Sequence, residues 1–565
     1  MPPERAPSGC PRLVLGPILR YVDGSSATIW VETDRACTVA VLGHCTPTFA
    51  VAGHHYALVV VSGLAPATAT PYDVRLDGAL AWPPPGWGLP HPVIRTRTAD
   101  APLQVLFCSC RSAAPHVAPY TLSLDADERG RGVDALRAYG LDLLDKAPTE
   151  WPDLMVFVGD QVYADDPSPA AQERIRAARG DDSGPDAPPV GMVAGFEEYT
   201  WLYHESWEPD VERWMLSVIP SAMVFDDHDM IDDWNISAGW VDDIRSLPWW
   251  DDHVVGGLVS YWVYQHLGNL SPSEIAAEGM LARFVEAGDA TNELWEWARE
   301  SEAHTPVFGG YQFSFSRDLG RTRLIVVDCR NGRLLDPSAR RILDDGEWAW
   351  LCQQVEADVD HLLIATSVPV FMVGGLSDFE RWSEAVCDGR WGRRASRLGE
   401  KLRRGVDLDH WPAFDTSFNQ LVRLFAALAG RGDAPATVSV LSGDVHFSYR
   451  APVTLRGAPT RADGIPVTRV NQIVCSPTRN VLRRRERRVL RFATSRAGRL
   501  LGRALRRSIG AGVPDASWSI EEGPLFANAV ATIDIDGKRA HLTLSAAHSD
   551  DEGRAVLEPA FDTSL

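Results

Sequence analysis

The sequence predicts a layered α/β fold that follows a small N-terminal β-sandwich. Short, continuous apolar runs recur between residues 103 and 475, and such runs are typical of strands buried on both faces. Amphipathic segments with helical spacing lie between several of these runs, which indicates helices packed on a sheet. Residues 1–98 instead carry short β-branched and aromatic segments, as β-sandwich domains do.

The N-terminal domain is predicted over residues 1–98. Residues 27–33 and 56–64 are rich in β-branched and aromatic side chains, and residues 72–78 alternate before an Asp-Gly turn. Short strands at this spacing indicate a sandwich of the immunoglobulin or fibronectin III kind. The second domain is then expected over residues 99–565.

The second domain is predicted from its apolar runs and from the helices between them. A helix is expected over residues 345–358, with Asp345 able to cap it, and another over residues 417–430. Residues 526–537 and 539–548 are expected to close the fold as a β-hairpin. The predicted buried strands are residues 103–108, 154–158, 222–225, 323–327, 361–367, 437–442 and 470–475.

Two acidic, proline-containing insertions, near residues 167–195 and 235–310, are expected to pass over the top of the sheet. Tryptophan is frequent in and beside the second insertion. These side chains either line a substrate cleft or pack in the core, which is their more usual place. They are Trp234, Trp240, Trp249, Trp250 and Trp262.

Composition narrows the class of protein. Hydrophobic residues make up 45% and charged residues 23%, the balance of a globular chain. We expect a cytoplasmic protein, because no apolar run approaches the roughly 20 residues of a membrane span and the first residues resemble neither a signal peptide nor a twin-arginine leader. The nine cysteines lack a framework spacing and are read as reduced thiols. A net charge of −21 argues against general nucleic-acid binding.

Residues 483–507 depart from this acidic composition. The segment holds eleven arginines and one glutamate, so it carries +10 and leaves −31 on the rest of the chain. One arginine-rich helix is expected, with an apolar strip of Val489, Phe492, Leu500, Leu501 and Leu505. Such a helix could contact a membrane surface or an anionic ligand such as a phospholipid or polyphosphate. We favour a third interpretation, in which the helix docks on the acidic surface of the protein itself.

Polar clusters follow most of the buried runs, where α/β folds place their sites. Cys110 lies just past the first run; it could be a nucleophile, a metal ligand or a core residue. Asp160 directly follows the second run, and Tyr163 comes three residues later. Asp444 and His446 are two residues apart after a later run, so they point to the same side of an extended segment.

The densest cluster is FDDHDMIDDW, which includes Asp227 and His228. Six acidic or imidazole groups in eight residues repel one another unless water or cations neutralise them. Carboxylate, imidazole, phenol and thiol groups from four strand ends together offer hard and soft metal ligands. Phosphoryl transfer at two metals, with a hydroxide nucleophile, uses such a set best.

These motifs resemble those of the PhoD-like (alkaline phosphatase D) metallophosphatases, within the calcineurin-like metallophosphoesterase superfamily. The resemblance runs from about residue 104 to residue 477 and includes five motifs in order. It implies two β-sheets flanked by helices in four αββα layers, with a metal centre at the strand ends and a phosphate ester as substrate. The motifs are GDQVYADD, FDDHDMIDDW, VVDCR, LSGDVHFSY and QIVCSPT.

The resemblance also implies roles for individual residues. Cys110, Asp160, Tyr163 and His446 would hold one metal, which the resemblance implies to be Fe³⁺, an ion that tyrosinate and thiolate stabilise. Asp160 would bridge to a second metal, Ca²⁺ or another divalent ion, held also by Asp227 and Asp444. His228 would be the general acid. Arg111 is a candidate for phosphate contact, with an exposed structural arginine as the equal alternative.

Two departures from the superfamily pattern stand out. The superfamily opens with an Asp-x-His pair, whereas this chain has CSCR, so Cys110 would take the place of those ligands, as in the PhoD-like branch. The superfamily's Asn-His pair is here Asp227-His228, which adds negative charge and favours a hard dication.

Two other functions compete with this one. A cysteine hydrolase could pair Cys110 with His228 or His446, but this leaves the many aspartates unexplained, and only Arg111 lies near enough in sequence to activate the thiolate. A non-catalytic binding protein could use the N-terminal domain and the arginine-rich segment, with a vestigial metal site. Every expected ligand position, however, holds a residue type that can bind metal.

Overall fold

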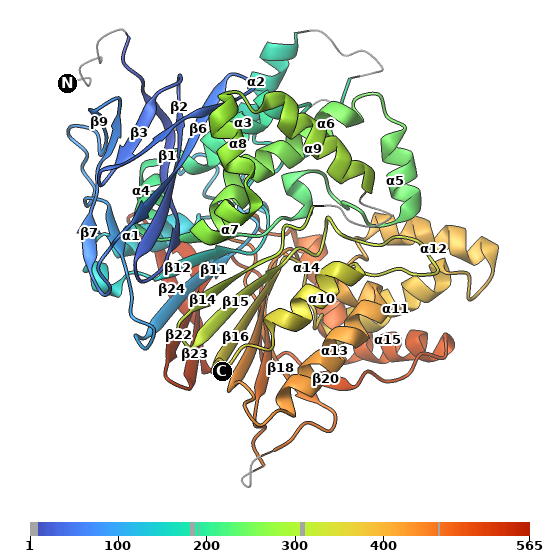
Figure 1. Cartoon of the computed structure of the whole chain (residues 1–565). Helices are drawn as coiled ribbons and strands as arrows, with labels where there is room; N and C mark the ends of the chain where they lie inside the picture. The colour runs from blue at the N-terminus through green and yellow to red at the C-terminus, as the bar shows by residue number, and fades with distance from the viewer. Residues whose placement is uncertain (1–8, 181–186, 190, 305–310, 461–463) are drawn as a thin grey trace.

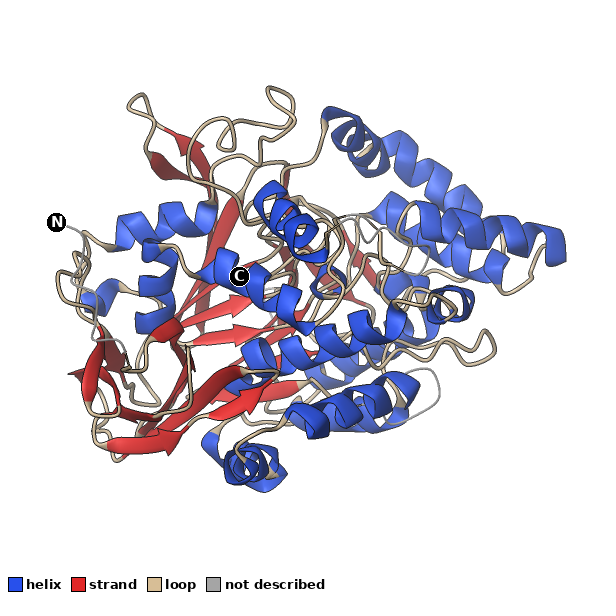
Figure 2. Ribbon diagram, turned by 90° about the horizontal axis from the view of Figure 1, so that it is seen from above, coloured by secondary structure: helices blue, strands red, loops and turns tan. Residues whose placement is uncertain are grey.

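The computed structural model describes residues 9–180, 187–189, 191–304, 311–460 and 464–565. Their strands form two large β-sheets at the centre and a group of small sheets near the N-terminus (Figure 1). Seen from above, the central strands are flanked by helices (Figure 2). The layered α/β fold predicted from the sequence is confirmed. Parts of the expected features at the N-terminus and in both insertions, residues 1–8, 181–186, 190 and 305–310, lie outside the described residues.

The N-terminal strands form two four-stranded antiparallel sheets with orders β1-β2-β6-β5 and β4-β3-β8-β9, and β7 pairs with β10. One hydrophobic cluster, which includes Ile29, Val39 and Val74, draws on both four-stranded sheets, as in a β-sandwich. The bounds are β1 Leu13–Val22, β2 Ser26–Thr33, β3 Thr38–Val41, β4 His44–Pro47, β5 Phe49–Val51, β6 His54–Ser62, β7 Ala69–Pro71, β8 Val74–Leu76, β9 Ala79–Trp82 and β10 Val93–Arg95.

Buried polar contacts join the N-terminal strands to the rest of the chain. The fully buried Arg20 on β1 donates hydrogen bonds to the Tyr264 carbonyl (2.9 Å) and to Asn269 Oδ1 (3.1 Å). Glu32 on β2 is also fully buried and accepts from the Tyr264 hydroxyl (3.0 Å). Its carboxylate oxygens lie 3.0 Å from His54 Nδ1 and 2.8 Å from His204 Nε2. Because buried charge without partners is costly, these contacts fix how the two parts pack.

Glu32→Gln is expected to lower the free energy of unfolding by about 2–3 kcal/mol, because it weakens hydrogen bonds to charged partners. Burial opposes the charged form of His54, but Glu32 overrides it and raises the His54 pKa. A raised folded pKa gives stability that is present below the unfolded pKa of about 6.5 and is lost as pH rises through the folded value. Urea unfolding from about pH 6 to about pH 9 should therefore show a smaller pH-dependent loss in the variant than in the wild type.

Glu197→Gln is the matched control for this substitution. Glu197 lies 2.7 Å from the other nitrogen of His54, but its side chain is 59% exposed. Exposed ion pairs contribute at most about 1 kcal/mol, so the control should stay within that limit. Equal losses in the two variants would show that the buried carboxylate does not hold this interface.

The two large sheets contain fourteen strands. The six-stranded sheet has the order β13-β12-β11-β22-β23-β24, and the eight-stranded sheet has the order β14-β15-β16-β17-β19-β18-β20, with β21 paired with β18 beside this path. The strand β14 is added antiparallel to β15, and β22 and β23 form the predicted closing hairpin. The bounds are β11 Leu103–Cys108, β12 Leu154–Phe157, β13 Ser221–Met223, β14 Phe315–Leu319, β15 Thr322–Val327, β16 His361–Thr366, β17 Thr437–Ser442, β18 Ser448–Leu455, β19 Arg469–Val474, β20 Ala516–Trp518, β21 Glu522–Leu525, β22 Ala529–Asp536, β23 Arg539–Ser549 and β24 Ala555–Ser564.

Alternate residues of one strand show how the layers pack. On β16, Leu363 and Ala365 belong to the cluster shared with the six-stranded sheet, whereas Leu362 and Ile364 belong to a cluster on the opposite face. That second cluster includes residues of two helices, α10 (Asp345–Gln354) and α13 (Asp415–Ala429). The helix α1 (Ala135–Leu143) contacts β22, β23 and β24 of the six-stranded sheet. Both sheets are therefore covered on both faces, in the order helix, sheet, sheet, helix.

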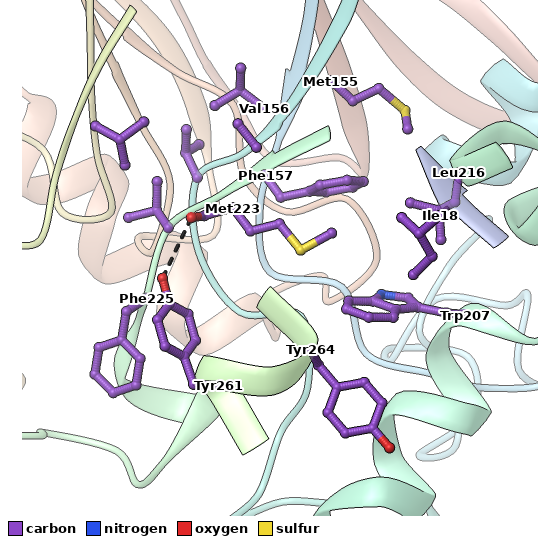
Figure 3. Packing of buried hydrophobic residues seen from close by; sticks show 14 of the residues in the cluster. Ile18, Met155, Val156, Phe157, Trp207, Leu216, Met223, Phe225, Tyr261 and Tyr264 are labelled. Atoms are coloured by element: carbon purple, nitrogen blue, oxygen red, sulfur yellow. Dashed lines mark hydrogen bonds between the residues drawn. The ribbon is translucent and has the colours of Figure 1, made fainter. Parts of the chain in front are cut away.

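The packing beneath the strand ends is continuous with the helical excursion. Figure 3 shows Phe157 at the end of β12 and Met223 at the end of β13 in one cluster with Trp207 and Tyr261. The Tyr261 hydroxyl donates to the Met223 carbonyl (3.5 Å). These large buried side chains hold the strand ends in place, because close-packed interiors resist displacement.

The helix predicted over residues 345–358 differs in its bounds. It ends at Gln354, and Asp344 rather than Asp345 caps it by accepting from the Glu347 backbone N–H (2.8 Å). The second predicted helix is α13, which buries Phe418 among other residues on its apolar face.

The excursion after β13 is largely helical, as predicted. The tryptophans of this region pack in the core: Trp234, Trp250 and Trp262 are at most 5% exposed, and the other two are half-buried against the same cluster. The helices after β13 are α5 Ala238–Arg245, α6 Trp250–Ser260, a π-helical turn Tyr261–His266, α7 Pro272–Glu278, α8 Met280–Ala287 and α9 Thr291–His304. Between β12 and β13 the chain forms α2 Pro169–Arg179, α3 Phe196–Trp207 and α4 Asp210–Val218.

The arginine-rich segment forms two helices, α14 (Arg484–Thr494) and α15 (Arg496–Ser508), where one helix was predicted. Ser495 has an extended backbone, and its hydroxyl accepts from the Gly498 N–H (3.1 Å), so it ends one helix and caps the next. No helix of the described residues combines the length and apolar character that crossing a bilayer requires.

Candidate metal centre

The site lies where parallel strands of both sheets end. In the six-stranded sheet β11, β12 and β13 run parallel, and in the eight-stranded sheet β15, β16, β17 and β19 do so. Carboxyl ends of parallel strands share one edge, so side chains that follow them are brought together. Most of the predicted site residues follow these strands directly.

The structure brings together three of the predicted ligands, Cys110, Asp160 and His446. One potential ligand atom from each lies within 4.8 Å of the others. Cys110 is 0% exposed and Asp160 is 1% exposed. These residues follow β11, β12 and β17, so the cluster is built from both sheets and depends on how they pack.

The backbone at this cluster is strained. Cys110, Asp444 and His446 have φ angles of 57°, 66° and 53°, in the left-handed region that side chains other than glycine rarely adopt. Residues held in this region cost on the order of 1–3 kcal/mol each and persist where the surrounding structure fixes them. Such strain gathers at functional sites, which agrees with a site at this position.

Gly443 allows the two sheets to approach at the site. A Cβ atom at this position would lie 2.2 Å from Ser109 Oγ and 2.6 Å from the Val158 carbonyl oxygen. Any larger residue would push β17 away from β11 and β12, and with it the two ligands that follow β17. The glycine of LSGDVHFSY thus has a steric role in the site.

Two buried oxygen atoms indicate that the cluster can hold a metal. Asp160 Oδ1 and the Tyr163 hydroxyl have no hydrogen-bond partner among the described residues. Buried polar atoms in native proteins almost always have partners, including water and ions. A thiol, a carboxylate, a phenol and an imidazole are a fitting ligand set for a transition metal. The first predicted ligand group therefore fits a metal.

The protonation of these ligand side chains depends on whether a cation neutralises their negative charge. Burial, with a further contribution from Asp227, raises the pKa of Asp160 well above its usual range. Burial and then the charge of Asp160 raise the pKa values of Cys110 and Tyr163 in the same direction. Without a cation the protein thus favours protonated ligands, and a cation would reverse this preference by binding the charged forms.

The second predicted ligand group is organised around Arg330, a fully buried residue just after β15. Its guanidinium lies 2.8 Å from Asp226 Oδ1, 3.0 Å from Asp227 Oδ1 and 2.6 Å from Asp444 Oδ1, and it also pairs with Asp409. Burial disfavours the charged Asp444, but Arg330 overrides this effect and lowers the Asp444 pKa. One guanidinium therefore contacts four carboxylates.

These contacts limit the oxygen atoms left for a second metal. Both oxygens of Asp444 have partners, since Oδ2 lies 3.1 Å from His410 Nε2. A cation bound by Asp227 and Asp444 would have to share these oxygens with Arg330. Asp160, Asp226 and Asp227 do place ligand atoms within 4.8 Å of one another. The second metal stays a prediction.

His228 lies beside the cluster and keeps contact with solvent. Its Nδ1 atom lies 2.8 Å from Asp165 Oδ1, its ring centre is 4.6 Å from that of Tyr163, and its side chain is 23% exposed. Burial opposes its charged form, but Asp165 overrides burial and raises the His228 pKa well above its usual range. The imidazole is thus held protonated, and its Nε2 atom lies 3.9 Å from Asp232 Oδ1, beyond hydrogen-bond distance.

Arg111 is committed to the fold. Nε donates to Asp134 Oδ2 (2.9 Å), Nη1 to the Ser206 carbonyl (2.7 Å) and Nη2 to Glu212 Oε1 (3.0 Å). All three guanidinium nitrogens therefore have partners, and the residue is 5% exposed. Neither an exposed position nor a free guanidinium is observed, so we do not propose that Arg111 contacts phosphate.

Sequence reasoning missed the residues that surround the predicted ligands. Arg330 stands in the recognised VVDCR motif, and its position after a buried strand was a usable signal. Asp165 lies in GDQVYADD beside Asp160, but nothing local marked it as the partner of His228. The loop that supplies His410 carried no signal beyond two nearby acidic residues, because its role depends on contacts across the fold.

Comparison with known proteins adds a likeness in fold. A family model described as "Domain of unknown function (DUF7800)" matches residues 10–94. No curated protein matches the sequence. A solved structure described as "Structure of PhoD" has a TM-score of 0.58 and 12% sequence identity, over 98% of this chain and 90% of that chain. At this identity the likeness establishes the fold, and it extends over nearly the whole length of both chains.

Proposed function

We propose that this protein is a metal-dependent phosphoesterase, a phosphatase or phosphodiesterase. The observation that carries the proposal is the cluster of buried Cys110 and Asp160 with half-buried His446, whose ligand atoms lie within 4.8 Å of one another. The unpartnered Asp160 Oδ1 and Tyr163 hydroxyl support it. The fold shared with the PhoD structure supports the same class of reaction. We assign Fe³⁺ to this cluster, and Ca²⁺ or another dication to the second group.

A metal in this cluster would supply a water of lowered pKa and would stabilise negative charge on a phosphoryl oxygen. The chain's own residues supply the rest. His228 holds a proton on the side away from Asp165 and can donate it to the leaving oxygen of the ester. Asp165 orients the imidazole and keeps it charged. Arg330 favours the ionised form of Asp444 and pairs with both Asp227 and Asp444, which fixes them next to the cluster.

The site does not favour a cysteine hydrolase. Burial and the charges of Asp160 and Asp226 raise the Cys110 pKa, whereas a thiolate nucleophile needs a lowered one. Burial and the nearby His228 lower the His446 pKa to about 4, which makes it a weak base. The Cys110 sulfur contacts two serine hydroxyls, Ser109 Oγ at 3.3 Å and Ser476 Oγ at 3.2 Å.

Removing metal is expected to abolish hydrolysis of p-nitrophenyl phosphate and bis-p-nitrophenyl phosphate. The purified protein should contain iron and show a broad tyrosinate-to-iron band in its visible spectrum. A chelator should remove both the band and the activity, and iron with calcium should restore them. The ratio of the two rates would establish whether monoesters or diesters are preferred.

Thiol alkylation of the metal-loaded protein provides the control. Cys110 is fully buried, so iodoacetamide should leave the rate unchanged, while the exposed Cys10 and Cys45 show by mass spectrometry that the reagent worked. Loss of activity on alkylation but not on chelation would support the cysteine hydrolase instead. A protein that binds no metal and hydrolyses neither ester after reconstitution would support the non-catalytic binding function.

A further inference from the structure

The apolar strip predicted for the arginine-rich segment faces outward. Val489, Phe492, Leu500 and Leu501 are 67%, 52%, 64% and 51% exposed, and Leu505 is half-buried. We call the exposed surface of α14 and α15 the arginine-rich face. We favoured an arginine-rich helix docked on the protein's own acidic surface, which would have buried this strip. Because the strip is exposed, that interpretation is wrong for these apolar residues.

The helix α15 does dock, but through its small residues. Gly502 lies against α11 (Gly374–Cys387), where a Cβ atom would come within 2.7 Å of the Gly375 carbonyl oxygen. Arg506 Nε pairs with Asp378 Oδ1 (2.7 Å) on the same helix. An amphipathic helix on a protein surface normally turns its large apolar residues inward. Here glycines face the protein and leucines face solvent, so the large apolar residues are left for another partner.

The charge of this face is also left unbalanced. Arg484 and Arg487 share Asp125, and Arg506 pairs with Asp378. The other eight of the segment's eleven arginines form no ion pair with any described residue. The segment thus presents positive charge beside exposed leucines, although the rest of the chain carries −31 by sequence.

The adjoining helix α12 (Arg393–Gly405) has the same character. It packs on α11, as α14 and α15 do, and α11, α12 and α15 lie on the right-hand side of the molecule in Figure 1. Its exposed residues include Leu398, 70% exposed, together with Arg393, Arg394 and Arg397. Trp391, directly before it, is 49% exposed. Exposed arginines beside exposed apolar side chains therefore occur on several helices that pack on α11, and not on one helix alone.

We propose that the arginine-rich face binds the surface of an anionic lipid bilayer. Phe492, Leu500 and Leu501 would enter the boundary between headgroups and acyl chains, while the arginines contact lipid phosphates. A nucleic acid or a soluble polyanion would use the arginines but would leave the leucines in water. The acidic remainder of the chain would be repelled by the same bilayer, which orients the protein with this face toward the lipid. This binding needs no turnover and stands apart from the proposed hydrolysis.

Vesicle flotation tests the proposal on the full-length protein. The protein should float with phosphatidylglycerol–phosphatidylcholine vesicles and should not float with pure phosphatidylcholine vesicles. Two triple variants, Phe492→Ser with Leu500→Ser and Leu501→Ser, and Arg488→Gln with Arg496→Gln and Arg503→Gln, should each weaken binding at least about tenfold. All six residues are exposed, so an unchanged thermal midpoint is expected and shows that each variant is folded.

Matched substitutions elsewhere are the controls. Arg12→Gln, Arg539→Gln and Arg554→Gln together remove the same charge from side chains that are 71%, 85% and 69% exposed, and Leu42→Ser with Leu80→Ser removes exposed leucines from the N-terminal strands. Both controls should bind as the wild type does. Wild-type binding by the serine variant, or equal loss in the arginine control, would overturn the proposal. Failure of the wild type to float with anionic vesicles would overturn it as well. So would displacement of the wild type from the vesicles by DNA, if the serine variant binds that DNA as tightly as the wild type does.

Discussion

Asp160→Asn is expected to lower the rate of phosphate-ester hydrolysis by more than about 100-fold. Mutating a residue that only orients a metal ligand typically lowers activity about 10- to 100-fold, and mutating the ligand itself should lower it at least as much. Asparagine keeps the shape of the side chain but cannot bind metal as a carboxylate does. The iron content and the visible band should fall with the rate. Steady-state kinetics and metal analysis on the same preparation measure all three.

The same substitution should leave the metal-free protein as stable as the wild type or more stable. Burial, together with neighbouring carboxylates, raises the Asp160 pKa, so its charged form is unfavourable without a cation. A folded pKa above the unfolded one makes stability fall as pH rises from the unfolded value of about 3.9 through the folded value, and Asn removes this loss. Urea unfolding of metal-free samples is the measurement.

Asp153→Asn is the control for Asp160→Asn. Asp153 precedes β12, at the end of the strand opposite Asp160, and accepts from the Gln104 N–H (2.9 Å). It should cost stability but leave the rate per iron unchanged. Near-wild-type turnover by Asp160→Asn would remove Asp160 from the proposed centre, whatever the control shows.

Arg330→Gln is expected to lower the free energy of unfolding by about 3–5 kcal/mol, the range for removing one partner of a buried ion pair. The substitution leaves Asp226 and Asp227 buried without their guanidinium, while Asp409 keeps Arg333 at 3.0 Å and Asp444 keeps His410 at 3.1 Å. We also expect a large loss of activity, because Asp227 and Asp444 would no longer be held beside the cluster.

The pH dependence identifies the cause of this loss. In the wild type Arg330 lowers the Asp444 pKa despite burial, so its contribution is present above the unfolded value of about 3.9 and is lost as pH falls through the folded value. In Arg330→Gln the carboxylates without a guanidinium are expected to have raised folded pKa values. The free energy of unfolding of the variant should therefore fall further below that of the wild type as pH rises. Urea unfolding of both proteins from about pH 4 to about pH 8 measures it.

Two further variants separate charge from geometry. Arg330→Lys keeps the charge but cannot reach several carboxylates at once, so it should recover only part of the stability. Arg340→Gln removes another buried arginine, whose guanidinium donates to the Ala413 and Ile236 carbonyls and pairs with no carboxylate of the described residues. The loss in free energy of unfolding caused by Arg340→Gln should not grow as pH rises. A pH-independent deficit in Arg330→Gln would contradict the role of Arg330 as the shared counter-charge.

The sequence alone determined the parallel strands of both large sheets and the place where three candidate metal ligands meet. Apolar runs buried on both faces, such as the one that places Leu362 and Leu363 in different layers, predict a covered sheet from local pattern. Cys110, Asp160 and His446 could be predicted to meet because they follow such runs, and parallel strands end at one edge. Their roles still depend on the resemblance and on the proposed chemistry.

Tertiary structure alone decided which charges neutralise one another and which apolar residues stay exposed. Arg330 reaches Asp444 from 114 residues away, and Arg111 meets Glu212 from 101 residues away. Leu500 and Leu501 face solvent because glycines of α15 fit more closely against α11. Periodicity determines the face of an element on which a residue lies. Which partner that face meets depends on how sheets and helices pack across the whole chain, and no local pattern encodes this packing.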